Sequence, residues 1–72
     1  MSAQMLRAIG DRVRRRRERL GWSQTALADL LGVAPSQVSR IEAGQQSISV
    51  VRLLDIADAL QTTPGRLLGG RS

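Results

Sequence analysis

The sequence predicts a single all-α domain of five short helices. Apolar residues recur at helical spacing along nearly the whole chain, and no segment alternates as a strand would. Gly21, Gly32, Gly44 and the Thr63-Pro64 pair interrupt that spacing, and such residues commonly end or begin helices. With 72 residues the chain can enclose one small core. We therefore expect residues 1–72 to form one domain.

The composition excludes several classes of function. The chain has no cysteine and no histidine, so a serine nucleophile would lack an evident base, and no metal-ligand cluster has suitable spacing. No apolar run approaches the roughly 20 residues of a membrane span, and Arg7 and Asp11 interrupt the first apolar residues where a secretory signal would lie. We expect a cytoplasmic protein that is not an enzyme and that has no cofactor, no metal and no membrane partner.

Positive charge is concentrated near the start of the chain. The formal net charge is +5, and residues 1–22 hold seven arginines against two carboxylates. A chain this basic attracts polyanions, of which nucleic acid is the commonest in a cytosol. A GC-rich coding sequence would explain why all eleven cations are arginine, but it would not explain their clustering.

The first two helices are expected at about residues 3–20 and from residue 24 onward. Ile9, Val13 and Leu20 share one face of the first, and Arg16 lies in the same stripe, where its stem can cover apolar surface. Ser23 is the expected cap of the second helix, with Trp22 and Leu27 as a hydrophobic staple. The buried face of the second helix is predicted to comprise Leu27, Ala28, Leu30 and Leu31.

A tight turn follows, and the third helix is expected from about Pro35 to Ala43. Two helices joined by a short turn with glycine form a helix-turn-helix unit. Val38 and Ile41 point inward, whereas polar side chains such as Ser36 and Arg40 point outward. A helix that enters the major groove of DNA needs such side chains near its start. Arginine can bond to guanine in a bidentate way, and glutamine can do the same to adenine.

Two more helices complete the expected core. Ser49 or Ser47 caps the fourth, and Thr63-Pro64 opens the short fifth, which has Leu67 and Leu68 as its apolar pair. The core face of the fourth helix is predicted to comprise Val50, Leu53, Ile56, Ala57 and Leu60.

The segment GWSQTALADLLGVAPSQVSRIEAG resembles the helix-turn-helix of the lambda-repressor-like family of bacterial and phage regulators, which includes the Cro-type proteins. The patterns L-L-x-I-A-x-A-L and T-P-x-x-L-L extend the resemblance over residues 9–68. It implies a compact five-helix lambda-repressor-like DNA-binding domain with the helix-turn-helix in its second and third helices.

The resemblance also implies a function. It indicates a sequence-specific regulator of transcription, expected to be a repressor, that binds double-stranded DNA as a homodimer on an inverted-repeat operator. The alternative is a protein-binding module, such as an antitoxin that contacts a toxin or a bridging protein that contacts RNA polymerase. Ser36 and Arg40 on the third helix favour DNA, since a protein-binding helix would be apolar or acidic there.

Candidate site residues follow from the matching positions. Those expected to meet base edges are Pro35, Ser36, Gln37 and Arg40, and those expected near phosphates are Ser23, Gln24, Thr25, Ser39, Gln45 and Ser47. The resemblance also implies a structural ion pair between Arg17 and Glu42. A dimer surface must lie beside the third helix, with Ile48, Val51, Leu54, Leu67 and Leu68 as candidates.

Overall fold

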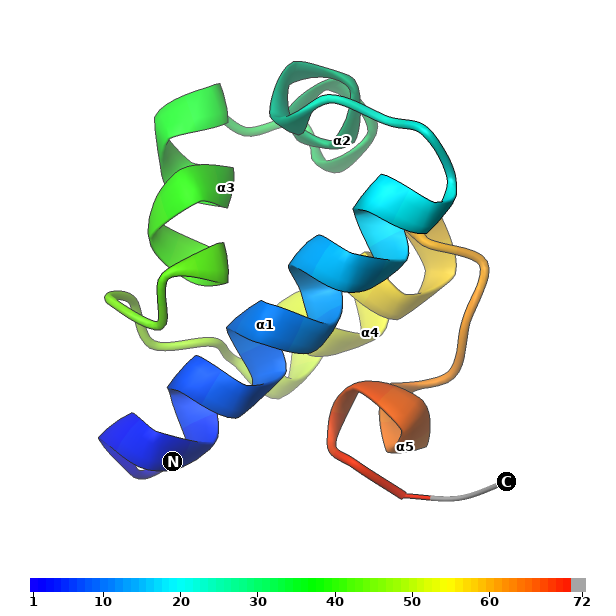
Figure 1. The fold of residues 1–72 in the computed structure, drawn as a ribbon. Coiled ribbons are helices and arrows are strands. Elements are labelled where there is room, and N and C mark those ends of the chain that lie inside the picture. The colour runs from blue at the N-terminus through cyan, green and yellow to red at the C-terminus, as the bar shows by residue number, and fades with distance from the viewer. Residues whose placement is uncertain (71–72) are drawn as a thin grey trace.

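The computed structural model describes residues 1–70 and confirms the all-α fold. Its helices are α1 (Ala3–Arg19), α2 (Gln24–Leu31), α3 (Pro35–Glu42), α4 (Val50–Ala59) and α5 (Pro64–Leu67). In Figure 1, α1 runs diagonally across the front of the molecule, with α4 behind it and with α3 and α5 on either side. None of these helices is both long enough and apolar enough to cross a membrane.

Hydroxyl side chains fix the first residue of most helices. The Ser23 Oγ accepts a hydrogen bond from the Ala26 amide at 3.0 Å, as predicted for α2. The Ser49 Oγ accepts from the Arg52 amide at 3.0 Å, so Ser49 and not Ser47 caps α4. Each such bond satisfies one of the amides that a helix start leaves without an intrahelical partner. Ala34 precedes α3 and has no side chain to do this.

The turn between α2 and α3 depends on Gly32. This residue has a left-handed backbone with φ +70°, which glycine adopts without the steric cost of a Cβ atom. The Val33 amide then donates back to the Ala28 carbonyl at 3.0 Å and closes the end of α2. Three residues join the two helices, and α3 leaves the turn across the direction of α2 (Figure 1).

The core lies between α1, α2, α3 and α4. Its buried apolar residues are Ile9, Val13, Leu27, Ala28, Val38, Ile41, Ile48, Leu53, Ile56, Ala57, Leu60 and Leu67. Two residues predicted to be buried are exposed instead, namely Leu30 at 60% and Val50 at 70%. Leu30 lies about 100° around α2 from Leu31 and lines an open hollow beside α4, where its side chain stays exposed to solvent. Val50 is the first residue of α4, and Ile48 from the preceding loop occupies the core at that end.

Arg16 is a structural residue at the edge of the core. Its Nε donates to the Leu60 carbonyl and its Nη2 donates to the Gln61 carbonyl, both at 2.9 Å. These carbonyls lie at the end of α4, where a helix lacks internal donors. Arg16 therefore does more than cover apolar surface with its stem, because it also satisfies the end of α4.

Gly10 allows α1 to approach α3 closely. A Cβ atom at position 10 would lie 2.4 Å from the Ile41 carbonyl oxygen and 2.6 Å from that of Glu42. Any side chain would therefore collide with the backbone of α3. The absence of a side chain at Gly10 sets the spacing between α1 and the last turn of α3.

Candidate nucleic-acid interface

The outer face of α3 is polar and exposed. Val38 and Ile41 are buried and fix the helix to the core, while the side chains on the other side are free to meet a partner. Of the predicted base-reading residues, Pro35, Ser36 and Arg40 are exposed and Gln37 is half-buried. The Arg40 Nε lies 3.4 Å from Gln46 Oε1, so the loop after α3 contacts this arginine.

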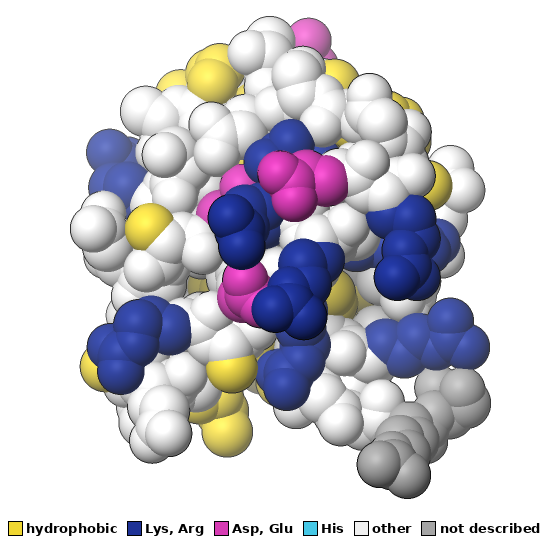
Figure 2. All heavy atoms as spheres, viewed as in Figure 1, with side chains coloured by type: hydrophobic (Ala, Val, Ile, Leu, Met, Phe, Trp, Pro, Cys, Tyr) yellow, Lys and Arg dark blue, Asp and Glu magenta, His cyan; other side chains and the backbone are white. Residues whose placement is uncertain are grey.

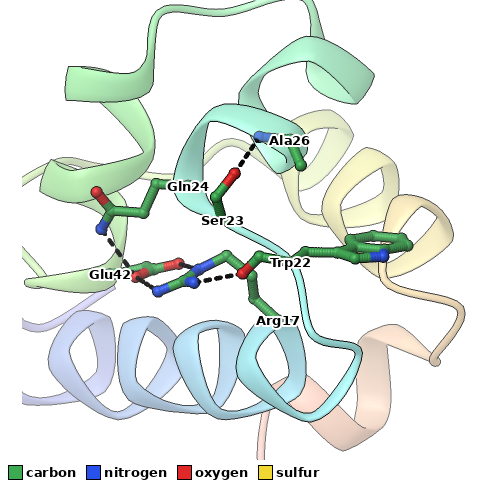
Figure 3. A network of polar contacts seen from close by, with 6 residues as sticks. All are labelled: Arg17, Trp22, Ser23, Gln24, Ala26 and Glu42. Atoms are coloured by element: carbon green, nitrogen blue, oxygen red, sulfur yellow. Dashed lines mark hydrogen bonds and ion pairs between the residues drawn. The ribbon is translucent and has the colours of Figure 1, made fainter.

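The start of α2 lies beside the last turn of α3. Gln24 is half-buried, and its Nε2 donates to Glu42 Oε1 at 3.1 Å, which joins the two helices (Figure 3). Ser23 and Thr25 on either side are exposed, although the Ser23 hydroxyl already serves as the α2 cap. The three residues predicted to lie near phosphates therefore surround the start of α2, which the Gln24–Glu42 hydrogen bond holds against α3.

Arg17 and Glu42 form the ion pair that the resemblance implies. The Arg17 Nε lies 2.6 Å from Glu42 Oε2, and its Nη2 lies 3.0 Å from Glu42 Oε1. The Arg17 Nη1 also donates to the Trp22 carbonyl at 2.7 Å (Figure 3). Only 11% of the Arg17 side chain and 4% of the Glu42 side chain are exposed. The pair connects α1 to both α2 and α3.

The hydrogen bonds that Arg17 donates to Glu42 raise the pKa of Arg17, and burial opposes this rise only in part. Because this pKa is raised, the stability that comes from the Arg17 charge is fully present below the ordinary arginine pKa and is lost as the pH rises through the raised value. Arg17 therefore stays charged throughout the physiological range.

A shallow basin opens where α1, α2 and α3 meet. Its lining residues are Arg7, Asp11, Arg14, Gln24, Ser39, Glu42 and Ala43. The centre of Figure 2 shows dark blue and magenta side chains side by side over this part of the molecule. Asp11 pairs with Arg14 at 2.9 Å. Arg7 and Arg14 were not among the predicted residues, although their spacing of seven places them on one face of α1.

The loop after α3 and the exposed part of α4 form the other side of the interface. Gln45 and Ser47 are exposed, as a contact with DNA backbone requires. Among the dimer candidates, Val51, Leu54 and Leu68 are exposed at 68%, 50% and 46%. Ile48 and Leu67 are core residues, exposed at 7% and 2%, so assigning them to a dimer surface was wrong. Both fill gaps between helices of the same chain.

Comparison with known sequences identifies the family. Residues 13–67 match the sequence profile of the helix-turn-helix family. The chain belongs to the helix-turn-helix family. An uncharacterised transcriptional regulator in the ATPase CF(0) region of Rhodospirillum rubrum is 46% identical over 52 residues, which cover 72% of this chain and 48% of that protein. The regulator AnsR of Bacillus subtilis is 39% identical over 59 residues, which cover 82% of this chain and 51% of that protein.

Solved structures of helix-turn-helix proteins share the fold. The restriction-modification controller protein C.AhdI from Aeromonas hydrophila is 41% identical, with a TM-score of 0.79 over 88% of this chain and 94% of that one. The P22 c2 repressor, solved in complex with a synthetic operator, is 35% identical, with a TM-score of 0.79 over 88% of this chain and 96% of that one.

These relatives are regulators and not enzymes, in agreement with the sequence analysis. This chain spans about half or less of the length of several curated relatives, namely 39%, 48% and 51%.

Proposed function

We propose that this helix-turn-helix domain binds double-stranded DNA in a sequence-specific way and represses transcription by occupying an operator. The observation that carries the proposal is the exposed polar face of α3, which has Arg40 at its centre and the start of α2 beside it. Helices of this kind enter the major groove with their first turns against the base edges. The P22 c2 repressor, which has this fold, was solved in complex with a synthetic operator, and that supports the proposal.

The residues of the interface divide into two roles. Arg40 is assigned to base reading, since arginine bonds to guanine O6 and N7 in a bidentate way; Ser36, Gln37 and Pro35 lie on the same helix. Gln24 is assigned to a phosphate, together with its neighbours Ser23 and Thr25 at the start of α2 and with Ser39, Gln45 and Ser47. Arg7 and Arg14 extend this phosphate surface along α1 through the basin that they line.

Replacing Arg40 by alanine is expected to relax sequence choice. The loss should be about 1–3 kcal/mol at one base pair, because a bidentate contact discriminates by that amount. Gln24→Ala serves as the matched variant and should weaken binding to all sequences alike. Competition between operator and scrambled duplex measures both effects. Equal losses on both duplexes for Arg40→Ala would contradict its role in base reading.

Salt dependence separates DNA binding from the alternative, a protein-binding module such as an antitoxin or a bridging protein. A domain that contacts about six phosphates should lose affinity with a log–log slope near −5, since each contact contributes about 0.9. The measurement is the dissociation constant for a selected duplex across a salt series. A flat response would favour the protein-binding module, with a toxin or RNA polymerase as its partner.

Two copies on one inverted-repeat operator are the proposed functional unit, in the cytoplasm where its DNA lies. One recognition helix reads only a few base pairs, which is too little information to select a site in a genome. A two-fold dimer places two such helices in successive major grooves, about 34 Å apart. Val51 and Leu54 on α4, with Leu68 at the rim, are the exposed apolar residues available for this contact.

Footprinting tests the dimer. We expect a symmetric protected region with two half-sites about 10–11 base pairs apart. Leu54→Glu should reduce it to one half-site, because a charge at an apolar contact opposes association. Leu30→Glu is the matched control, since Leu30 is an exposed leucine on α2, at 60% against 50% for Leu54, and it should leave both half-sites protected. A single half-site for the unaltered chain at saturation would rule the dimer out.

A further inference from the structure

A second basic site lies on the far side of α1 from α3. It is a cavity of about 200 Å³ between α1, α5 and the segment that joins α4 to α5. Its lining residues are Arg12, Arg15, Arg16, Arg19, Thr62, Arg66 and Leu67, so within residues 1–70 five guanidinium groups and no carboxylate line it. Figure 2 shows dark blue side chains gathered on the right of the view, over the part of Figure 1 where α1 ends and α5 lies.

The position of this cavity separates it from the DNA interface. Arg12, Arg16 and Arg19 follow one another at spacings of four and three, so they share one face of α1. Gly10 and Arg17 lie on the opposite face and contact α3. A duplex held against α3 would therefore have α1 between itself and the cavity. The charges of this arginine cavity are not needed for operator contacts.

Two of the guanidinium groups are already fixed in place. The two bonds from Arg16 to the end of α4 hold its guanidinium at the cavity wall. The Arg12 Nη1 lies 3.4 Å from the Leu67 carbonyl oxygen, at the end of α5. Each of these side chains has further N–H groups beyond the ones used, since a guanidinium carries five. Donors held in this way lose less entropy when an anion binds.

The size of the cavity limits the anion it can take. The four lining arginines of α1 repel one another, and one of them, Arg15, forms a 2.9 Å ion pair with Asp11. Several negative charges are needed to balance Arg12, Arg16 and Arg19 in a space smaller than the roughly 300 Å³ of a typical small-ligand pocket. Carboxylate side chains carry one charge each, whereas a phosphoryl group carries about −1.5 to −2 with three acceptor oxygens. A chain of linked phosphoryl groups therefore supplies several negative charges in a smaller volume than separate carboxylates would.

We infer that the arginine cavity binds a polyphosphate group, either free inorganic polyphosphate or the phosphate chain of a nucleotide. The inference stands apart from the proposed DNA function, because it uses other residues on another face. Arginine is suited to this ligand, since its planar fork matches phosphate oxygens in a bidentate way. Thr62 adds a hydroxyl to the lining.

Titration of the 72-residue chain with inorganic triphosphate by calorimetry tests the site, at about 150 mM salt to screen diffuse attraction. We expect saturable binding of one triphosphate per chain. Arg19→Gln and Arg15→Gln should each weaken it about tenfold, the effect of one charge-assisted hydrogen bond. Arg12 and Arg16 are left intact, because their bonds to the ends of α4 and α5 also stabilise the fold.

The matched control is Arg52→Gln. Arg52 carries the same charge on α4, but it lines neither the arginine cavity nor the basin at the DNA interface. This variant should change the triphosphate affinity less than about twofold, as expected for a site outside the contact. Equal weakening by Arg52→Gln and Arg19→Gln, or binding that never saturates, would overturn the inference. A parallel titration with a nucleoside triphosphate distinguishes the two ligands. A nucleotide site would bind the nucleoside triphosphate more tightly than inorganic triphosphate. A site for free polyphosphate would not.

Discussion

Replacing Glu42 by alanine is expected to destabilise the domain by about 3–5 kcal/mol, because the Arg17 guanidinium would remain buried without its counter-charge. A domain of this size has a total stability of only about 4–11 kcal/mol. The melting temperature should therefore fall by more than about 10 °C. Thermal unfolding followed by circular dichroism measures the change. The loss should be seen without DNA, since the pair joins helices of one chain.

Glu18→Ala is the control for this prediction. Glu18 is an exposed carboxylate on α1, the helix that carries Arg17. Its removal should change the stability by less than about 0.5 kcal/mol. The double variant Arg17→Met with Glu42→Met should be more stable than Glu42→Ala alone, since it leaves no stranded charge. A melting curve for Glu42→Ala that matches the unaltered chain would mean that the pair contributes nothing to folding.

Replacing Gly10 by alanine is expected to cost at least about 3 kcal/mol, at the upper end of the range for overpacked cores. The new methyl group would meet two backbone carbonyl oxygens of α3, at 2.4 Å and 2.6 Å. Backbone atoms cannot rotate aside as a flexible side chain can, so α1 and α3 would have to separate. That separation would also stretch the Arg17–Glu42 pair. Urea unfolding gives the change in stability.

Gly65→Ala provides the matched comparison. Gly65 is also a glycine within a helix, and the nearest atom to a Cβ there is 4.0 Å away. Without a collision, alanine should be neutral or stabilise the helix by up to about 1 kcal/mol. If both variants behaved alike, helix propensity rather than the approach of α3 would govern position 10.

Local patterns in the sequence predicted the helices well, because each boundary has a local physical cause. The Ser23 cap, the left-handed Gly32 and the Thr63-Pro64 helix start all depend on residues within one turn. The Arg17–Glu42 pair joins residues 25 positions apart. Periodicity alone could not have found it, and only the family resemblance did.

What the sequence could not predict depends on how the helices pack against one another. Leu30 and Val50 fit an apolar pattern, but no helix covers them. Ile48 and Leu67 were expected at the surface, but neighbouring helices bury them. The close approach at Gly10 is equally invisible in the sequence, since nothing local distinguishes it from a glycine that merely weakens a helix.

The half-buried Trp22 gives the domain a built-in optical probe. It is the single tryptophan of a chain without tyrosine or phenylalanine, so its fluorescence has no other aromatic contribution. Its backbone carbonyl accepts the bond from Arg17, and its ring packs against the core (Figure 3). Loosening of the core around the ring would expose the indole to water and shift its emission to longer wavelength. Emission spectra can therefore report on the packing of the core in every variant without any added label.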